Sequence, residues 1–240
     1  MTLVFPMAGL SSRFTKAGYA KPKYMLDVAS QTVFYHSVFG FSKLFNEVKV
    51  LFIYRDIENT KDFIDAQCKE MGLINYEAIA LDAPTDGQAE TVYLGLKHSS
   101  VPTDDSILIF NIDTFRPNFS LPKELNLKQV DGYLEVFEAK GDHWSFVLPE
   151  NKTSNKVIKT AEKERISSLC SSGLYYFKSL HDYNKTFEKI SKLNDRVKNE
   201  FFIAPMYNYL IEANKNIRYA KISLDEIVFC GTPNEYQKLK

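Results

Sequence analysis

A turn of small residues near the start of the chain has the composition of a phosphate-binding loop. Gly9, Ser11 and Ser12 follow an apolar stretch over residues 2–7, and Arg13 comes next. Because these side chains are short, backbone N–H groups can approach an anion closely and surround phosphate oxygens. The guanidinium of Arg13 is suited to the same oxygens. The alternative is an ordinary turn, since such residues commonly follow a strand.

The segment Lys21-Pro22-Lys23 places two more cations after this turn. Its proline keeps the chain extended, so that the lysines stand beside the small-residue loop. Alone, the segment is equally typical of a solvated loop. Together with the turn and Arg13, it predicts a polyphosphate site at the carboxyl end of a first strand, where open α/β sheets bind their ligands.

Other phosphate motifs fit the sequence poorly. The pattern G-x-x-x-x-G-K-[ST] is absent, which argues against a P-loop kinase or ATPase. The loop also lacks the three glycines and the acidic residue of the dinucleotide fingerprint, so a nicotinamide oxidoreductase is disfavoured. The 30 Lys and Arg balance the 30 Asp and Glu, which gives no general attraction for nucleic acid or for an anionic membrane.

Two further polar positions follow or precede regular elements. Asp113 ends the apolar stretch 106–112, where a carboxylate can hold Mg²⁺ against triphosphate oxygens or can simply cap a turn. Gly87 ends a polar loop, and Gln88 stands at the start of an expected helix over 89–96. The backbone amides there can bind a ligand, or they can belong to a plain helix start.

The apolar pattern predicts an α/β fold with a mixed, mainly parallel central sheet flanked by helices, because strands and helices alternate. The expected strands lie at 2–7, 48–54, 76–81, 106–113, 132–138, 145–148 and 156–160, and the expected helices at 31–45, 57–71 and 89–96. The last two strands are expected to form a hairpin. A chain of 240 residues is within the range of one large domain.

The three cysteines, Cys68, Cys170 and Cys230, show neither a metal-binding spacing nor a disulfide framework, which indicates a reducing compartment. The N-terminus has no signal-peptide pattern, and no apolar run approaches the ~20 residues of a membrane span. We therefore expect a cytoplasmic protein. Aromatic residues make up 14% of the chain, which indicates a packed globule and offers candidates for a homodimer interface.

The first 28 residues resemble the signature of the sugar-nucleotidyltransferases, G-x-G-[ST]-R followed by P-K. The matching positions are Gly9, Ser12, Arg13, Pro22 and Lys23. Ser11 replaces the second glycine. The resemblance extends over almost the whole chain, and it implies a Rossmann-like nucleotidyltransferase fold. It also implies that Arg13 and Lys23 meet the phosphates at the reacting centre, and that the nucleoside triphosphate is held by Ala8, Gly9, Leu10, Ser11 and Ser12.

Other segments resemble further motifs of this family. Gly87, Gln88 and Ala89 match the loop that reads the nucleobase, where an amide side chain both donates and accepts hydrogen bonds. Asp113 matches the aspartate that binds the metal. Asn111 occupies an earlier acidic position, so that any second ligand there is neutral.

The second half of the chain matches the part of the family that binds the acceptor. Glu162 and Lys163 match a pair that faces the acceptor, although such a charge run is also typical of a solvated surface. Gly173 matches a glycine that lets substrate approach the backbone. Glu200 matches a residue that contacts substrate, or it is an acid in the first turn of a helix. The expected single domain then has a nucleotide-binding half at about 1–130 and an acceptor-binding half at about 131–240.

One position departs from the family where it matters for the metal. Gly231-Thr232-Pro233 matches the terminal G-T-P, and relatives place a metal-binding aspartate two residues before this glycine, where this chain has Phe229. Asp225 and Glu226 are near in sequence, without the same spacing. Asp113 is therefore expected to hold Mg²⁺ together with waters and substrate phosphates.

The resemblance implies transfer of a nucleoside monophosphate from an NTP to a phosphorylated acceptor, with release of pyrophosphate, for capsule or surface-polysaccharide precursor synthesis. Residues 6–19 are similar to small bacterial enzymes of this kind, which favours CTP and phosphorylated glutamine; UTP or dTTP with a sugar 1-phosphate is the alternative. Two other classes stay open. A glycosyltransferase would need a D-x-D motif, of which residues 111–113 supply half, and Phe229 suggests a non-catalytic nucleotide-binding regulatory module.

Overall fold

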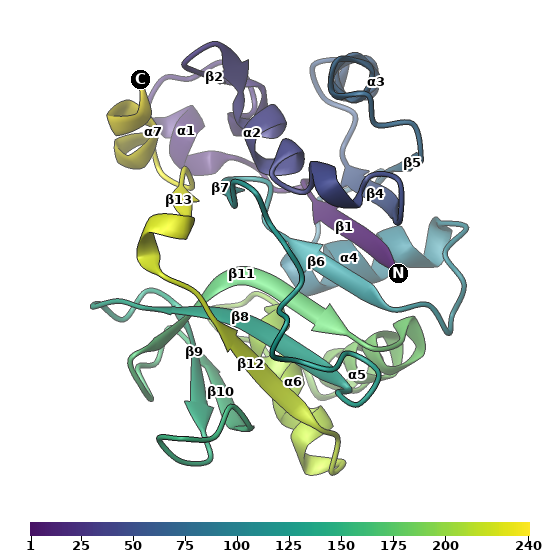
Figure 1. Ribbon diagram of the computed structural model, residues 1–240. Coiled ribbons are helices and arrows are strands. Elements are labelled where there is room, and N and C mark those ends of the chain that lie inside the picture. Colours follow the sequence, from purple (N-terminus) through teal and green to yellow (C-terminus); the bar gives the residue numbers. More distant parts are fainter.

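The first apolar stretch forms β1 (Thr2–Pro6), and the sheet is built around this strand. The computed structural model describes all residues from 1 to 240 (Figure 1). Leu3, Val4 and Phe5 are fully buried, because helices cover both faces of the sheet. The parallel part of the sheet consists of β1, its two neighbours β4 (Lys49–Tyr54) and β6 (Ile107–Phe110), and β5 (Tyr76–Ala80) beside β4.

A mainly antiparallel part continues the same nine-stranded sheet beyond β6. Its strands are β8 (Gly132–Glu138), β9 (Ser145–Pro149), β10 (Val157–Glu162), β11 (Leu169–Phe177) and β12 (Ile217–Lys221). Along one edge β11 pairs with β8; along the other it pairs with β6 near its end and with β9 near its start. The sheet therefore divides within β11, where Gly173 has a φ of +88°.

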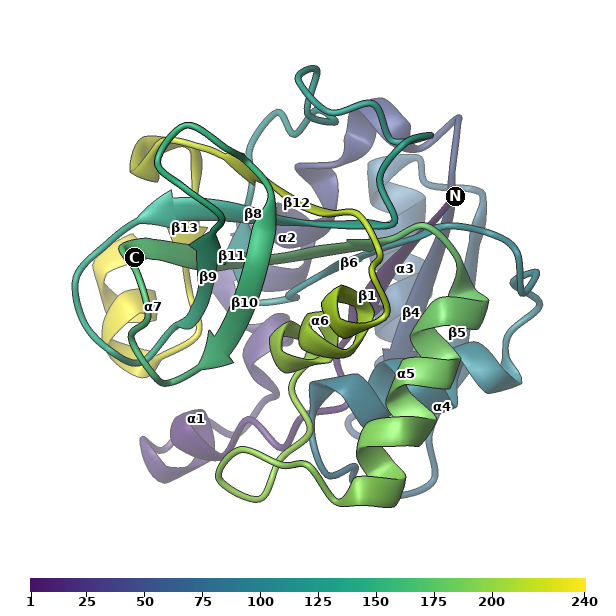
Figure 2. The same ribbon diagram turned by 90° about the horizontal axis from the view of Figure 1, so that it is seen from below.

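Alternate residues of the central strands face opposite layers of helices. Val4 packs with α4 (Gln88–His98), α5 (Leu180–Leu193) and α6 (Ile203–Glu212), which Figure 2 shows on one side of the sheet. Leu3 and Phe5 pack with α2 (Val33–Phe39) and α3 (Thr60–Met71) on the other side. No helix in the structure is both long enough and apolar enough to cross a membrane.

The predicted fold class is confirmed, and the strands expected from the sequence are present within a few residues. Two helices are shorter than expected. The helix over 31–45 begins at Val33 and ends at Phe39. Gly40 follows, where a Cβ would lie 2.5 Å from the backbone oxygen of Arg116, and a 3₁₀ turn over Ser42–Leu44 comes next. The helix over 57–71 begins only at Thr60. The expected hairpin is β9–β10, which pair antiparallel.

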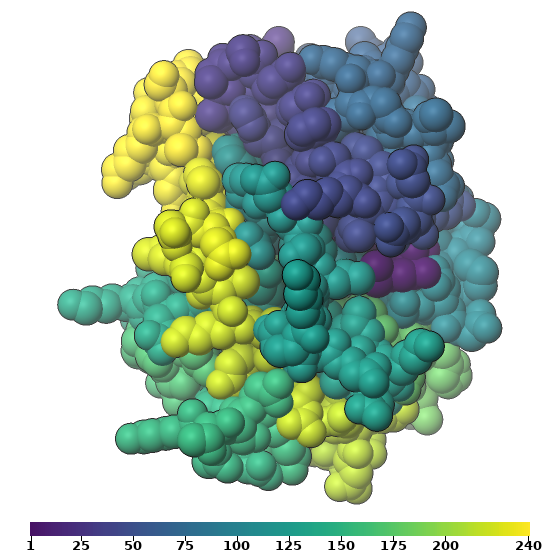
Figure 3. Space-filling model, viewed as in Figure 1, coloured from purple at the N-terminus to yellow at the C-terminus, as the bar shows by residue number.

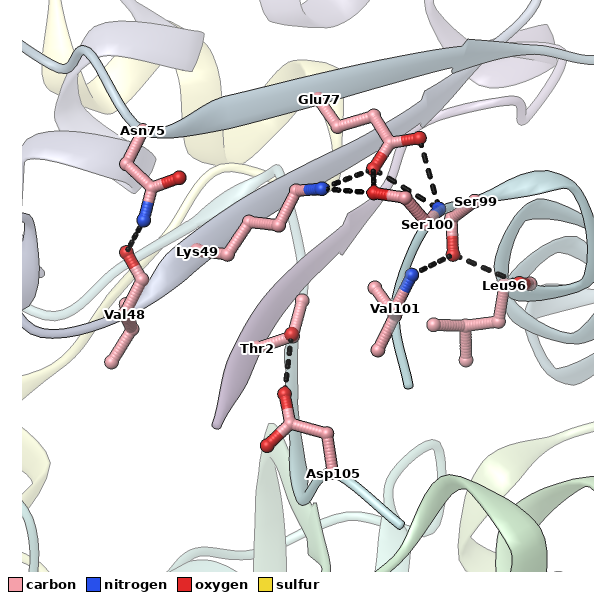
Figure 4. A network of polar contacts seen from close by, with 10 residues as sticks. All are labelled: Thr2, Val48, Lys49, Asn75, Glu77, Leu96, Ser99, Ser100, Val101 and Asp105. Atoms are coloured by element: carbon pink, nitrogen blue, oxygen red, sulfur yellow. Dashed lines mark hydrogen bonds and ion pairs between the residues drawn. The ribbon is translucent and has the colours of Figure 1, made fainter. Parts of the chain in front are cut away.

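Side chains fasten the amino ends of the parallel strands to one another (Figure 4). Lys49 of β4 forms an ion pair of 2.5 Å with Glu77 of β5, and the backbone N–H of Ser100 donates to the same carboxylate. Thr2 of β1 donates to Asp105, just before β6, at 2.8 Å. The amino ends of these strands are therefore tied to one another by internal polar contacts.

The C-terminal segment returns to the first half of the chain. There β13 (Val228–Phe229) pairs antiparallel with β7 (Thr114–Phe115), and α7 (Pro233–Leu239) lies beside α1 (Ser12–Lys16). Tyr236 of α7 packs on Phe14 and donates to the carbonyl of Asp27 at 2.9 Å. In the space-filling view, the yellow C-terminal segment contacts the purple N-terminal half (Figure 3). A short hairpin, in which β2 (Asp27–Val28) pairs antiparallel with β3 (Gln31–Thr32), lies between α1 and α2 in the chain.

A buried ion pair joins these segments under the carboxyl ends of the strands. Arg116 and Glu135 are each 4% exposed, and two nitrogen atoms of the guanidinium contact the two carboxylate oxygens at 2.9 and 3.0 Å. Ser172 of β11 donates to the same carboxylate at 2.9 Å. Arg116 also donates to the carbonyl of Glu226, in the 3₁₀ turn Leu224–Glu226 that precedes β13, at 2.8 Å.

We predict that Glu135→Gln lowers the free energy of unfolding by about 3–5 kcal/mol, because it leaves the buried Arg116 guanidinium with only the half-exposed Glu226 carboxylate, 3.7 Å away, as counter-charge. Urea unfolding followed by circular dichroism measures the change. The control is Glu138→Gln, on the same strand but with an exposed side chain that pairs with Lys221; it should unfold as the unchanged protein does. Equal stability of the two variants would show that the buried pair has no such role.

Candidate active site

Two adjoining cavities lie at the carboxyl ends of β1 and β6. The β1 cavity, of about 550 Å³, is lined by residues 6–13 and by the loop that ends at Gln88. The β9 cavity, of about 470 Å³, is lined by residues around the start of β9, the end of β10, the middle of β11 and the segment after β13. The residues that border both are Leu10, Ser11, Ser12, Arg13, Lys23, Gln88, Asn111, Asp113, Glu200 and Phe202. Arg13, Lys23 and Asp113 thus stand at the junction.

The small-residue turn leads from β1 into the short helix α1. Ser11 caps this helix in the left-handed region, with a φ of +51°, at the position where the family signature has glycine. Its hydroxyl accepts a hydrogen bond from the backbone N–H of Lys23 at 3.3 Å. The turn and the lysine segment are therefore joined directly. Arg13 is exposed and borders both cavities.

Lys23 and Asp113 form an ion pair at the junction. The carbonyl of Asp113 accepts from the backbone N–H of Cys230 at 2.9 Å, which places the C-terminal segment beside it. A Cβ on Gly231 would lie 3.1 Å from the Asp113 carboxylate, so this glycine leaves room beside the oxygen. A carboxylate that borders both cavities fits Mg²⁺, which is commonly bound through one or two carboxylates and substrate phosphates.

No second carboxylate comes from position 229. Phe229 directs its ring toward Trp144, with the ring centroids 4.9 Å apart. Asp225 and Glu226 border neither cavity. Glu235 borders the β9 cavity, and its carboxylate accepts from the backbone N–H of Thr232 at 2.9 Å in the cap of α7.

The loop that the sequence predicts to read the nucleobase borders the cavities through Gly87 and Gln88 but not through Ala89. Gln88 begins α4 and borders both cavities, and its amide nitrogen donates to Asn111 at 2.6 Å. Gly173 gives Asn111 its place, because a Cβ there would lie 2.1 Å from the Asn111 amide nitrogen. Gly87 borders the β1 cavity, but Ala89 is fully buried and its N–H donates to the carbonyl of Phe201 at 3.0 Å. Ala89 therefore supports this loop from behind and does not reach the cavity.

The expected acceptor residues gather around the β9 cavity. Glu162 accepts a hydrogen bond from Ser145, and Lys163 lies 3.7 Å from its other oxygen. Burial raises the pKa of the Glu162 carboxyl, and the nearby Glu200 carboxylate acts in the same direction. Lys163 itself packs 4.1 Å from the ring centroid of Phe202 and does not border the cavity.

Glu200 borders both cavities but lies before α6, which begins at Ile203 and has no acid in its first turn. The alternative that Glu200 is a first-turn acid is therefore wrong. Sequence reasoning also missed residues that border the β9 cavity, among them Trp144, Ser145, Tyr175 and Glu235. Of these, Trp144 carried a signal, because it is the only tryptophan of the chain and directly precedes an expected strand.

No protein-family model and no curated protein matches the chain. Among solved structures, it is 45% identical to the nucleoside-diphosphate-sugar pyrophosphorylase from Vibrio cholerae RC9, over 99% of this chain and 98% of that one, with a TM-score of 0.94. It also resembles the inositol-1-phosphate CTP transferase from T. maritima, with 13% identity over 99% and 94% of the chains and a TM-score of 0.75. It resembles an apo UDP-glucose pyrophosphorylase as well, with 12% identity over 99% of this chain and 96% of that one and a TM-score of 0.74. The last two show the shared fold alone.

We predict that Ser11→Gly is more stable than Ser11→Ala by about 1 kcal/mol, because both lose the hydroxyl but only alanine keeps a Cβ in the left-handed region. Urea unfolding of the two variants isolates this backbone term. A difference near zero would mean that the turn relaxes out of the left-handed conformation when the hydroxyl is removed.

Proposed function

Because the chain belongs to the sugar-nucleotidyltransferase family, we propose that it transfers a nucleoside monophosphate from an NTP to a phosphorylated acceptor and releases pyrophosphate. The observation that carries this proposal is the meeting of Arg13, Lys23 and Asp113 where the two cavities join. Two phosphorylated substrates that enter from opposite cavities would bring their phosphates together at these charges.

The β1 cavity is the proposed site of the NTP, with the turn over residues 8–12 against its phosphates. The β9 cavity is the proposed site of the acceptor, near Glu162, Gly173 and Glu200. The division into halves at about residue 130 follows the same scheme. The segment after β13 does not fit this division into halves. It packs on the first half of the chain, although it borders the β9 cavity of the second half.

In the proposed reaction, an oxygen of the acceptor phosphate attacks the α-phosphorus of the NTP, and the bond from that phosphorus to the pyrophosphate breaks. No protein nucleophile is required, because such reactions depend on positioning and charge stabilisation. Arg13 and Lys23 would neutralise the charge that gathers on the α-phosphate and on the leaving group. Asp113 would hold Mg²⁺, which, when bound, neutralises phosphate charge further.

CTP is the first choice of nucleotide. The amide nitrogen of Gln88 is engaged by Asn111, which leaves its carbonyl oxygen as an acceptor. Cytosine presents an exocyclic amine that can donate to this oxygen, whereas uracil and thymine present a carbonyl at the same place. Phosphorylated glutamine is the first choice of acceptor, for capsule or surface-polysaccharide precursors. UTP or dTTP with a sugar 1-phosphate is the second candidate, and the name of the relative at 45% identity favours it.

We predict that pyrophosphate is released with Mg²⁺, CTP and phosphorylated glutamine, and that EDTA abolishes the release. The measurement compares CTP, UTP, dTTP, GTP and ATP, each with phosphorylated glutamine and with a panel of sugar 1-phosphates. Release with UTP or dTTP and a sugar 1-phosphate alone would replace the first choice by the second. Binding of an NTP without release from any pair would instead identify a regulatory module.

We predict that Lys23→Ala lowers kcat by about 10²-fold or more, because it removes a preorganised positive charge from the reacting phosphates. The matched control is Lys21→Ala, since Lys21 lies on the same loop and borders neither cavity. Circular dichroism should show both variants folded. Turnover within a few-fold of the unchanged protein in Lys23→Ala would remove Lys23 from the mechanism.

A further inference from the structure

Two aromatic rings form one wall of the β9 cavity. Trp144 and Phe229 are half-buried, and the fully buried Phe137 supports them from behind, with centroids 5.2 and 5.3 Å away. The indole N–H of Trp144 donates to the carbonyl of Lys140 at 3.2 Å, so its hydrogen bond is made outside the cavity. The wall therefore has no free polar group of its own, and beside Trp144 it continues into the ring of His143.

The charge around this wall is negative. The residues that border the β9 cavity and not the β1 cavity include the carboxylates Glu162 and Glu235, the imidazole of His143, whose ring centroid lies 4.4 Å from that of Trp144, and no lysine or arginine. The Glu162 side chain is 5% exposed. Ser145 donates to one of its carboxylate oxygens, and the other oxygen has only the ammonium of Lys163 nearby, at 3.7 Å. Arg13 and Lys23 lie at the junction instead. An acceptor whose phosphate meets them would place its other end among carboxylates and aromatic rings.

We propose that the β9 cavity binds an ammonium group of the acceptor between the Trp144–Phe229 wall and the Glu162 carboxylate. A cation over an aromatic face is attracted by the negative π surface of the ring, and a buried carboxylate with an incompletely bonded oxygen adds a counter-charge. A neutral sugar ring would gain neither term. The acceptor class is thus a small molecule that carries both a phosphate and an ammonium, such as a phosphorylated amino acid or amino alcohol. This inference rests on the proposed transferase function and narrows its acceptor.

The single tryptophan makes the proposed subsite directly observable. Titrations excited at 295 nm report binding beside Trp144, with four probes: ethanolamine phosphate, its isostere propyl phosphate, in which a methyl group replaces the ammonium, phosphoserine and glucose 1-phosphate. We expect ethanolamine phosphate to bind at least about 5-fold more tightly than propyl phosphate, which corresponds to about 1 kcal/mol, and more tightly than glucose 1-phosphate. Tighter binding of phosphoserine than of ethanolamine phosphate would identify an amino acid, and the reverse an amino alcohol.

Variants then test the residues named. Glu162→Gln and Phe229→Leu should each reduce the preference for ethanolamine phosphate over propyl phosphate to less than about half. The controls are Glu164→Gln, which changes an exposed acid beside Glu162, and Phe39→Leu, which changes an exposed ring that does not border the cavity. Both controls should keep the preference for ethanolamine phosphate over propyl phosphate. Circular dichroism excludes misfolding, and Phe229→Leu carries the test if Glu162→Gln does not fold.

The same ratio measured in Lys23→Ala separates this inference from the proposed function. A preference for ethanolamine phosphate that persists in this variant supports the subsite independently of catalysis. Equal dissociation constants for ethanolamine phosphate and propyl phosphate, or tighter binding of glucose 1-phosphate, would overturn the ammonium subsite even if pyrophosphate release is observed. Absence of pyrophosphate release with the preference intact would overturn only the transferase reaction.

Discussion

The buried ion pair between Arg116 and Glu135 fixes three segments that are far apart in sequence. Arg116 comes three residues after Asp113, Glu135 binds Ser172 beside Gly173, and the Arg116 guanidinium holds the turn before β13. The first two segments carry residues that border the β9 cavity, and the turn leads into Phe229, which borders it as well. Because an unpaired charge at this depth is strongly unfavourable, the three segments are held in one arrangement. The shape of the site therefore depends on a contact that borders neither cavity.

Much of the fold followed from apolar periodicity, because strands that are buried on both faces leave a clear pattern. The sequence also predicted correctly that the carboxyl ends of the parallel strands carry the small-residue turn, Lys23 and Asp113, since these ends meet on one side of the sheet. The division of the sheet within β11 was not predicted. It depends on β6 and β9 sharing one edge of the same strand, and no local pattern encodes that pairing.

The parts of the site that sequence reasoning missed depend on contacts over long separations. Ala89 matched a ligand-binding motif, yet its backbone N–H donates to the carbonyl of Phe201. Gln88 was assigned to the nucleobase, and its bond to Asn111 became visible only in three dimensions. Trp144 and Phe229 come from opposite ends of the second half and meet as one wall. Motifs therefore located the junction, while the partners of each side chain required the structure.

The Lys23–Asp113 pair has a thermodynamic consequence for ligands. While the two side chains hold each other, each is a weaker partner for an anion or for a divalent cation. A phosphate that draws Lys23 away frees the carboxylate, and a cation on Asp113 frees the ammonium. Occupancy by one kind of ion thus raises the affinity for the other by the same factor in both directions. For the proposed substrates, the Lys23–Asp113 pair would thus favour the binding of metal and nucleotide together over the binding of either alone.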